Sequence, residues 1–127
     1  MIYDITPVPK PRMTQQDKWL KRPATQKYWA YKKEIQLKQV KLPEFYHIIF
    51  VLPMPKSWPK KRKQLMAGTP HKQKPDKDNL EKGLLDALFI DDCGVWTGCV
   101  TKLWGYEGKI VVDECDIPEI VMQIGGA

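Results

Sequence analysis

The sequence has few cysteines and histidines, the side chains on which most zinc sites and disulfide frameworks depend. Among its 127 residues there are three cysteines and two histidines. Cys93, Cys99 and Cys115 are odd in number and form no CxxC pair, so we expect reduced thiols. His47 and His71 are too few and too far apart in the sequence to indicate a histidine metal site.

Long apolar segments are absent too. No run of about 18 apolar residues occurs, and the N-terminus lacks an apolar signal segment. We therefore expect a cytoplasmic protein with no membrane partner. No internal repeat and no linker divides the chain, and its length suits a single globular domain with a modest core over residues 1–127.

The chain is basic overall but carries a local cluster of carboxylates. Its formal net charge of +6 and its pI of about 9.2 favour a nucleic-acid partner, although merely soluble basic proteins share such values. Yet the segment 74–82 reads KPDKDNLEK and is followed by Asp91-Asp92. Clustered carboxylates repel polyanions unless a divalent cation lies between them. A basic surface around oxygen ligands is what a metal-dependent nuclease needs.

Hydrophobic patterning predicts a mixture of strands and helices. Apolar runs bounded by proline or glycine predict strands at residues 2–6, 45–52, 94–106, 109–112 and 120–124. Helical spacing predicts helices at residues 25–40, 58–67 and 79–88. The turn at 105–108 would join two of the strands in a hairpin. Three prolines between Pro7 and Pro11 predict a stiff, extended segment.

Polar residues mark the expected helix ends. Thr25 and Ser57 would cap the first two helices, and Gly68 would stop the second. Asp78 and Glu81 have capping-box spacing at the start of the third helix. The apolar faces are expected at Tyr28, Tyr31 and Ile35 of the first helix and at Leu80, Leu84 and Leu88 of the third.

Each carboxylate of the cluster has an ordinary explanation, but together they favour a site. Asp78 can be a helix cap, worth about 1 kcal/mol, and Asp76 a turn residue. Asp91 and Asp92 can form a solvated turn. However, Asp76 and Asp78 lie two apart in an expected extended segment and so point to the same side. The following helix returns the chain through Asp91 and Asp92 into a strand that can lie beside that segment. Carboxylates held so close repel one another, and a bound Mg²⁺ or Mn²⁺ removes the conflict.

Lys82 lies one helical turn beyond Asp78. It can form an i, i+4 salt bridge with Asp78, worth roughly 0.2–0.5 kcal/mol. It can also reach a phosphate oxygen and stabilise the charge that builds up during phosphodiester cleavage. The two roles are compatible.

The cluster resembles the motif of the RusA family of Holliday junction resolvases. The matching residues are Lys74-Pro75-Asp76-x-Asp78-Asn79-Leu80-x-Lys82, Leu85-Asp86-Ala87-Leu88, Asp91-Asp92-x-x-Val95 and Lys102. The segments 7–12 and 54–58 are similar to phage-type members, so the resemblance covers nearly the whole chain. It implies a small α+β domain with a mixed β-sheet flanked by helices, about three of which the patterning above predicts.

The resemblance also implies roles for the acidic residues. Asp76, Asp78 and Asp92 would hold the catalytic Mg²⁺, for which Mn²⁺ would substitute, and Lys82 would assist phosphate chemistry. Asp91 matches the neighbouring acidic position and would be a secondary ligand or structural. The connection from the helix to this acidic pair is shorter than in some members, which leaves the choice between Asp91 and Asp92 open. The family cuts four-way DNA junctions as a homodimer that places symmetric nicks.

Basic residues are candidates for contacts with DNA strands. They are Lys10, Arg12, Lys18, Lys21, Arg22, Lys56, Lys60, Lys61, Arg62, Lys63, Lys74 and Lys102. Asp86 matches a recurring helix position of the family and is expected to be structural. Two alternatives stay open: a nuclease for other branched or single-stranded DNA, and a non-catalytic junction-binding protein whose carboxylates only cap and brace.

Overall fold

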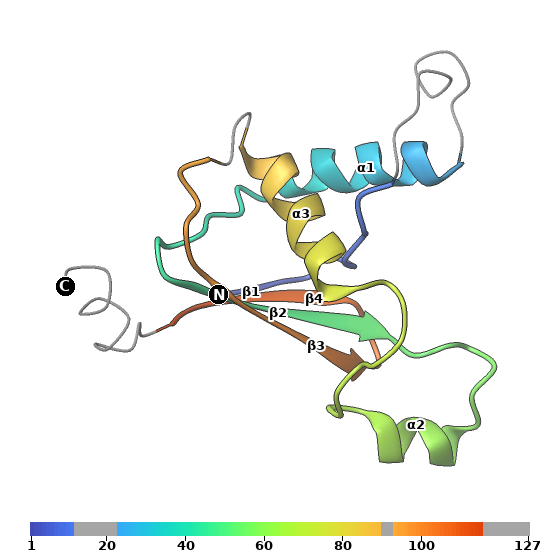
Figure 1. Ribbon diagram of the computed structural model, residues 1–127. Coiled ribbons are helices and arrows are strands. Elements are labelled where there is room, and N and C mark those ends of the chain that lie inside the picture. Colours follow the sequence, from blue (N-terminus) through green and yellow to red (C-terminus); the bar gives the residue numbers. More distant parts are fainter. Residues whose placement is uncertain (12–22, 90–92, 116–127) are drawn as a thin grey trace.

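The computed structural model describes residues 1–11, 23–89 and 93–115, which form a four-stranded sheet and three helices (Figure 1). The strands are β1 (Ile2–Tyr3), β2 (Tyr46–Pro53), β3 (Cys99–Gly105) and β4 (Lys109–Glu114). The helices are α1 (Pro23–Leu37), α2 (Lys60–Met66) and α3 (Lys77–Leu88). None of the described helices is long and apolar enough to cross a membrane.

The sheet is mixed, with strand order β1-β4-β2-β3. The central strand β2 pairs in parallel with β3 and antiparallel with β4, while β1 pairs antiparallel with β4. The chain therefore forms a small α+β domain, which confirms the expected fold class. The parallel pair needs a crossover connection, and α2 and α3 lie within it.

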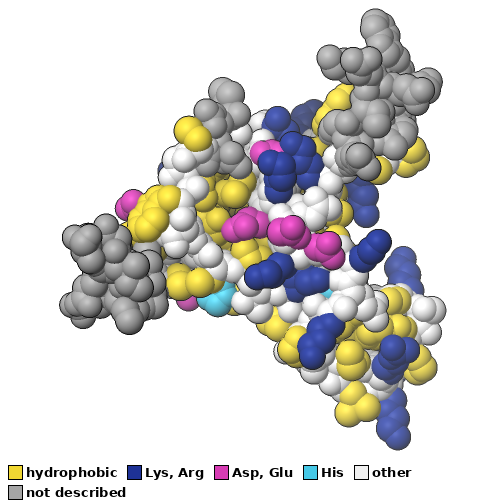
Figure 2. Space-filling model, viewed as in Figure 1, with side chains coloured by type: hydrophobic (Ala, Val, Ile, Leu, Met, Phe, Trp, Pro, Cys, Tyr) yellow, Lys and Arg dark blue, Asp and Glu magenta, His cyan; other side chains and the backbone are white. Residues whose placement is uncertain are grey.

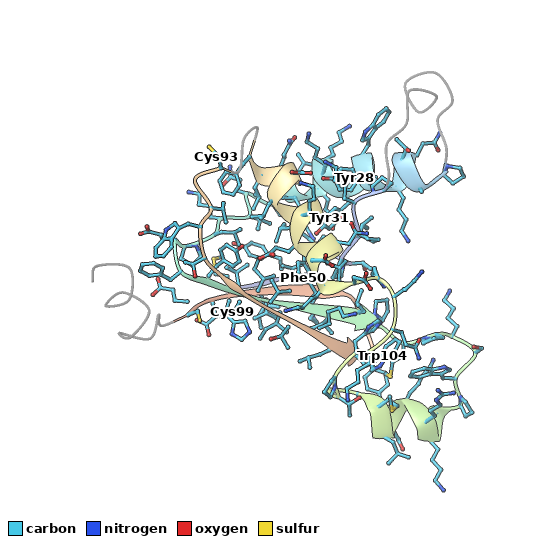
Figure 3. The ribbon with its side chains drawn as sticks, in the orientation of Figure 1. Tyr28, Tyr31, Phe50, Cys93, Cys99 and Trp104 are labelled. Carbon is cyan, nitrogen blue, oxygen red and sulfur yellow. The ribbon has the colours of Figure 1, made fainter. Side chains whose placement is uncertain are left out.

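Helices α1 and α3 cover one face of the sheet and bury the alternate residues of its strands (Figure 1). In β2 the side chains of Tyr46, Ile48, Phe50 and Leu52 are buried, as the period of two along a strand requires. Figure 3 shows Phe50 beneath the two helices, near Tyr28 and Tyr31 of α1. Burial of apolar side chains in this layer is the main source of stability, at about 25 cal/mol per Å².

The buried face expected for α1 is confirmed, but its cap is not. Tyr28, Tyr31 and Ile35 are buried. The helix starts at Pro23, so Thr25 lies inside the first turn and does not cap it. Proline is common at the first helical position because its fixed φ suits the helix, and because an N–H at that position would have no intrahelical partner. The helix also ends at Leu37, three residues before the expected end.

Helix α2 is shorter than expected and lies off the end of the sheet to which β2 and β3 run (Figure 1). It begins at Lys60 with Pro59 at the N-cap position, so the expected Ser57 cap is wrong. Gly68 follows the helix with a φ of 81°, a conformation that glycine adopts without steric cost, which agrees with its expected role as a stop. No residue of α2 is buried.

The expected hairpin at residues 105–108 is wrong, because β3 and β4 do not pair with each other. Strand β2 lies between them, and the turn crosses the end of β2. Strand β3 also begins at Cys99, five residues later than predicted, and β1 ends at Tyr3. The predicted strand at 120–124 lies outside the described residues.

Candidate active site at the start of helix α3

Helix α3 begins directly after Asp76. The carbonyl oxygen of Asp76 accepts a 3.1 Å hydrogen bond from the backbone N–H of Leu80, which closes the first turn. Asp76 therefore occupies the N-cap position with extended backbone angles, and Asp78 lies within the first turn. The predicted capping box is wrong, because Asp78 is already inside the helix. The side chain of Asp76 makes no capping hydrogen bond, so its carboxylate stays available at the surface.

The carboxylates of Asp76 and Asp78 line the same open depression of about 730 Å³. The other residues that line it are Lys72, Gln73, Lys74, Lys77 and Lys102. The expected geometry is wrong, since only Asp76 is extended and Asp78 is helical. The helix nevertheless brings both side chains to one surface, as the sequence predicted.

The electrostatic setting of this depression suits bound anions and cations together. The N-terminal end of a helix carries a partial positive charge, which stabilises the nearby carboxylates of Asp76 and Asp78. Figure 2 shows a short row of acidic side chains in the middle of this face, with lysines and arginines on both sides. Such an arrangement can hold a cation and a phosphate at the same place.

The described residues supply two carboxylates to this site and not a complete metal cluster. Within residues 1–11, 23–89 and 93–115, no group of three His, Cys, Asp or Glu side chains is placed to hold a metal ion. Asp91 and Asp92 lie outside the described residues, so their predicted convergence with Asp76 is not covered by the structure.

Lys82 is exposed in the second turn of α3, and the described residues include no ion pair between Lys82 and Asp78. Because this side chain is exposed, a phosphate can reach it. Lys10, a predicted DNA contact, instead forms an ion pair with Asp86. This pair holds the N-terminal segment on α3 and agrees with the structural role expected for Asp86.

Lys102 connects strand β3 to the loop that precedes Asp76. Its ammonium donates hydrogen bonds of 2.7 Å to the carbonyl oxygens of Gln73 and of Pro75. The Lys74–Pro75 peptide bond is cis. The side chain of Lys74 is exposed in the same depression and is accessible to DNA.

The remaining basic candidates divide into two groups. The side chains of Lys56, Lys60, Lys61 and Arg62 are exposed in or before α2, and Lys63 is half-buried. The guanidinium of Arg62 lies 4.0 Å from the ring centroid of Trp58, a cation–π contact. Arg12, Lys18, Lys21 and Arg22 lie outside the described residues.

Two contacts near the site were not predicted from the sequence. The hydroxyl of Tyr46 donates a 2.6 Å hydrogen bond to Oε2 of Glu81, the residue assigned to the capping box. His71 is buried, with its ring centroid 4.0 Å from that of Trp104. Burial lowers the pKa of His71, and the charge of Lys102 lowers it further. Both contacts join residues far apart in the sequence, so no local pattern indicates them.

The comparison with protein families agrees with the residues that make up this site. The family model described as endodeoxyribonuclease RusA matches residues 3–113. This range includes all three helices, the acidic cluster and the whole sheet except for its outermost residues. A search of curated proteins and a search of solved structures each found no match. Because the match covers most of the chain, the protein belongs to the RusA family of endodeoxyribonucleases, which makes it a nuclease that acts on DNA.

Proposed function

We propose that the protein is a Mg²⁺-dependent, structure-selective endodeoxyribonuclease that resolves four-way DNA junctions by paired, symmetric nicks. The observation that carries this proposal is the placement of Asp76 and Asp78 at the positive end of α3, in one open depression with four lysines. Carboxylate oxygens, which would bind the cation, therefore lie beside Lys72, Lys74 and Lys77, which would bind a DNA backbone.

The donor set fits Mg²⁺. This ion prefers oxygen ligands and is commonly held by one or two carboxylates, with water and substrate phosphates completing its coordination. Asp76 and Asp78 are both exposed, and Asp76 makes no capping bond. One oxygen of Asp78 accepts the backbone N–H of Asn79 at 3.0 Å, which orients its carboxylate. Asp92, with Asp91 beside it, is proposed as a further ligand on the family motif alone.

The reaction proposed is hydrolysis of a DNA phosphodiester by water. The bound ion would lower the pKa of the attacking water and neutralise charge on the leaving oxygen. Lys82 would donate to a phosphate oxygen and stabilise the negative charge that increases in the transition state. Because water is the nucleophile, the site requires no Ser, Cys or Tyr for this purpose.

Paired nicks in one junction require two active sites, so we propose that the protein acts as a homodimer. A dimer would carry a formal charge of about +12, twice the +6 of one chain, and so suits a branched DNA in which phosphates lie close together. Sedimentation velocity would then give a species of twice the 14.8 kDa chain mass at the concentrations used for cleavage. A monomer under those conditions would contradict symmetric nicking.

The experiment that tests the proposal compares DNA shapes. An immobile four-way junction, a replication fork, a flap, a linear duplex and a single strand are each labelled on every strand in turn. The protein is added with Mg²⁺, with Mn²⁺ or with EDTA, and the cut positions are mapped. The expected result is cleavage of the junction at symmetric positions on two opposing strands, in Mg²⁺ or Mn²⁺ only.

Other outcomes would separate the alternatives. Faster cleavage of forks, flaps or single strands than of the junction would identify a nuclease for another branched or single-stranded DNA. Tight junction binding with no cleavage in either metal would identify a non-catalytic junction-binding protein.

A further inference from the structure

We propose that Lys102 is a positioning residue that ties β3 to the loop before α3 and thereby sets the carboxylate of Asp76 in the active site. This inference rests on the proposed function, since it concerns the same site. It gives Lys102 a role different from the phosphate contact expected from the sequence.

The loop before α3 is attached to β3 by backbone hydrogen bonds only over its first residues. The N–H of Gly68 donates to the carbonyl oxygen of Trp104 at 2.8 Å, and the N–H of Trp104 donates to that of Thr69 at 3.0 Å. The N–H of His71 donates to the carbonyl oxygen of Lys102 at 3.0 Å. Beyond His71, none of the described backbone groups up to Pro75 bonds to the backbone of β3.

The side chain of Lys102 continues the attachment where the backbone ladder stops. Its ammonium donates 2.7 Å hydrogen bonds to the carbonyl oxygens of Gln73 and of Pro75, so one group holds both ends of the last three residues before Asp76. A charged donor makes these bonds about twice as strong as bonds between neutral groups. Pro75 has no backbone N–H, so only its carbonyl oxygen can form a backbone hydrogen bond.

Aromatic packing fixes the other end of the same loop. The ring of Trp104 packs against those of His71 and Trp58, with centroid distances of 4.0 Å and 4.8 Å. Figure 3 shows Trp104 at the end of β3 beside α2. The loop is thus held at its start by Trp104 and at its end by Lys102, which leaves Asp76 at the end of a braced segment. Asp76 then starts α3 through its carbonyl bond to Leu80.

The consequence for catalysis follows from this geometry. A carboxylate that is displaced by about 1 Å from a productive position can cost about 100-fold in rate. If the tie is removed, Asp76 is free to move, while Lys60, Lys61 and Lys82 stay in place because they lie on helices outside this loop. Lys102 variants should therefore bind junctions normally and cut them slowly. If Lys102 only contacted phosphate, its removal would instead lower the affinity for DNA and reduce the salt dependence of binding.

The test uses Lys102→Met, Lys102→Arg and a matched control, Lys38→Met. Lys38 also donates a 2.7 Å hydrogen bond to a backbone carbonyl, that of Asp4, but it directly follows α1 and lies outside the depression. Two quantities are measured: the single-turnover cleavage rate at saturating protein in Mg²⁺, and the Kd for the uncut junction in EDTA.

The expected rate for Lys102→Met is about 10- to 100-fold below wild type, with the Kd within about 3-fold. Lys102→Arg keeps the charge but not the compact ammonium, so its rate should lie between those of wild type and Lys102→Met. Lys38→Met should match wild type in both quantities. A wild-type rate for Lys102→Met would overturn the proposal, as would a weakened Kd with a wild-type rate. If Lys102→Met does not fold, a wild-type rate for Lys102→Arg overturns it equally.

A second readout does not depend on activity. Hydrogen–deuterium exchange of the backbone amides in residues 72–77 should be faster in Lys102→Met than in wild type and unchanged in Lys38→Met. If the wild-type protein cuts no DNA, the proposed function fails, and exchange in this segment still decides whether Lys102 braces it. Equal exchange in wild type and Lys102→Met would refute the positioning role.

Discussion

The hydroxyl of Tyr46 donates a 2.6 Å hydrogen bond to Oε2 of Glu81, which joins the first residue of β2 to the second turn of α3. Gly98 makes the approach possible, because a Cβ atom there would lie only 2.2 Å from Cε1 of Tyr46. Glu81 lies three residues after Asp78, so this contact fixes the start of α3 against the sheet. The position of the candidate active site therefore depends on a contact made about one helical turn after Asp78.

Removal of the Tyr46 hydroxyl should destabilise the fold. Tyr46→Phe should lower the free energy of unfolding by about 1.5–3 kcal/mol, the range for a hydrogen bond to a charged group. Glu81→Gln keeps an acceptor and should cost less, about 0.5–1.5 kcal/mol. Urea unfolding of the three proteins measures both values. A Tyr46→Phe variant within about 0.5 kcal/mol of wild type would show that the bond does not brace α3.

A methyl group at Gly98 should also destabilise the protein. Gly98→Ala places a Cβ against the buried ring of Tyr46, and overpacking of this kind typically costs about 1–3 kcal/mol. Gly94→Ala is the matched control, since a Cβ there meets nothing within 4 Å. Thermal and urea unfolding should separate the two variants clearly. Equal effects at Gly94 and Gly98 would contradict the described path of the chain into β3.

His71 should make stability depend on pH. Burial, and then the charge of Lys102, lower the pKa of His71 in the folded state, so the unfolded chain binds its proton more readily. The stability from neutral His71 is fully present above the unfolded pKa of about 6.5 and is lost as the pH falls through the folded pKa. As the pH falls from about 7.5 to about 5.5, the free energy of unfolding measured in urea should decrease less for His71→Gln than for wild type. Identical pH profiles would contradict this.

The lysines of α2 should contribute to DNA binding through charge alone. A double variant, Lys60→Ala with Lys61→Ala, should reduce the slope of log K against log salt by about 0.9 for each DNA phosphate that these lysines neutralise in the wild type. Lys32→Ala with Lys33→Ala, on the exposed side of α1, removes the same charge away from α2. Junction binding is measured in EDTA between roughly 50 and 200 mM salt. Equal slopes for the two double variants would exclude a specific role for α2.

Cys99 and Cys115 should form a disulfide under oxidation. Their Sγ atoms lie 3.0 Å apart, since Cys99 begins β3 and Cys115 directly follows β4. All three cysteines are thiols in the structure. Hydrogen peroxide would oxidise one thiolate to a sulfenic acid with release of water, and the second thiol would displace a second water to form the bond. The product should be about 2 Da lighter and should keep Cys93 alkylatable. A disulfide through Cys93, or none in native protein, would contradict this geometry.

Local patterns predicted the buried faces well. Tyr28, Tyr31 and Ile35 of α1 and the apolar residues of β2 follow the helical and strand periods, which burial on one side imposes directly on the sequence. Helix ends were less predictable. At α1 the fixed φ of Pro23 suits the first helical position, so the helix starts before the apparent cap Thr25. Helix α3 likewise starts at Lys77, before the apparent cap Asp78.

Long-range pairing was not predictable from the sequence. The residues around 105–108 have the composition of a hairpin turn, and nothing near them indicates that β2 inserts between β3 and β4. Local patterns predicted that Asp76 and Asp78 share one surface. They did not indicate the bonds of Lys102 to the preceding loop or of Tyr46 to Glu81, because these also join residues far apart in the sequence. These contacts can be predicted only once the sheet order is known.

The most direct test of the metal-site account compares wild type with Asp76→Asn and Asp78→Asn on one four-way junction. The rate of nicking in Mg²⁺ and the Kd in EDTA are measured in parallel, with Asp113→Asn, an exposed carboxylate on β4, as a control. Both site variants should lose more than about 100-fold in rate, since the loss of even an outer partner of a metal ligand costs about 10- to 100-fold. They should bind the junction in EDTA at least as tightly as wild type, because a repelling carboxylate is removed, and Asp113→Asn should cut normally. Metal-dependent nicking at the wild-type rate by either site variant would contradict the account.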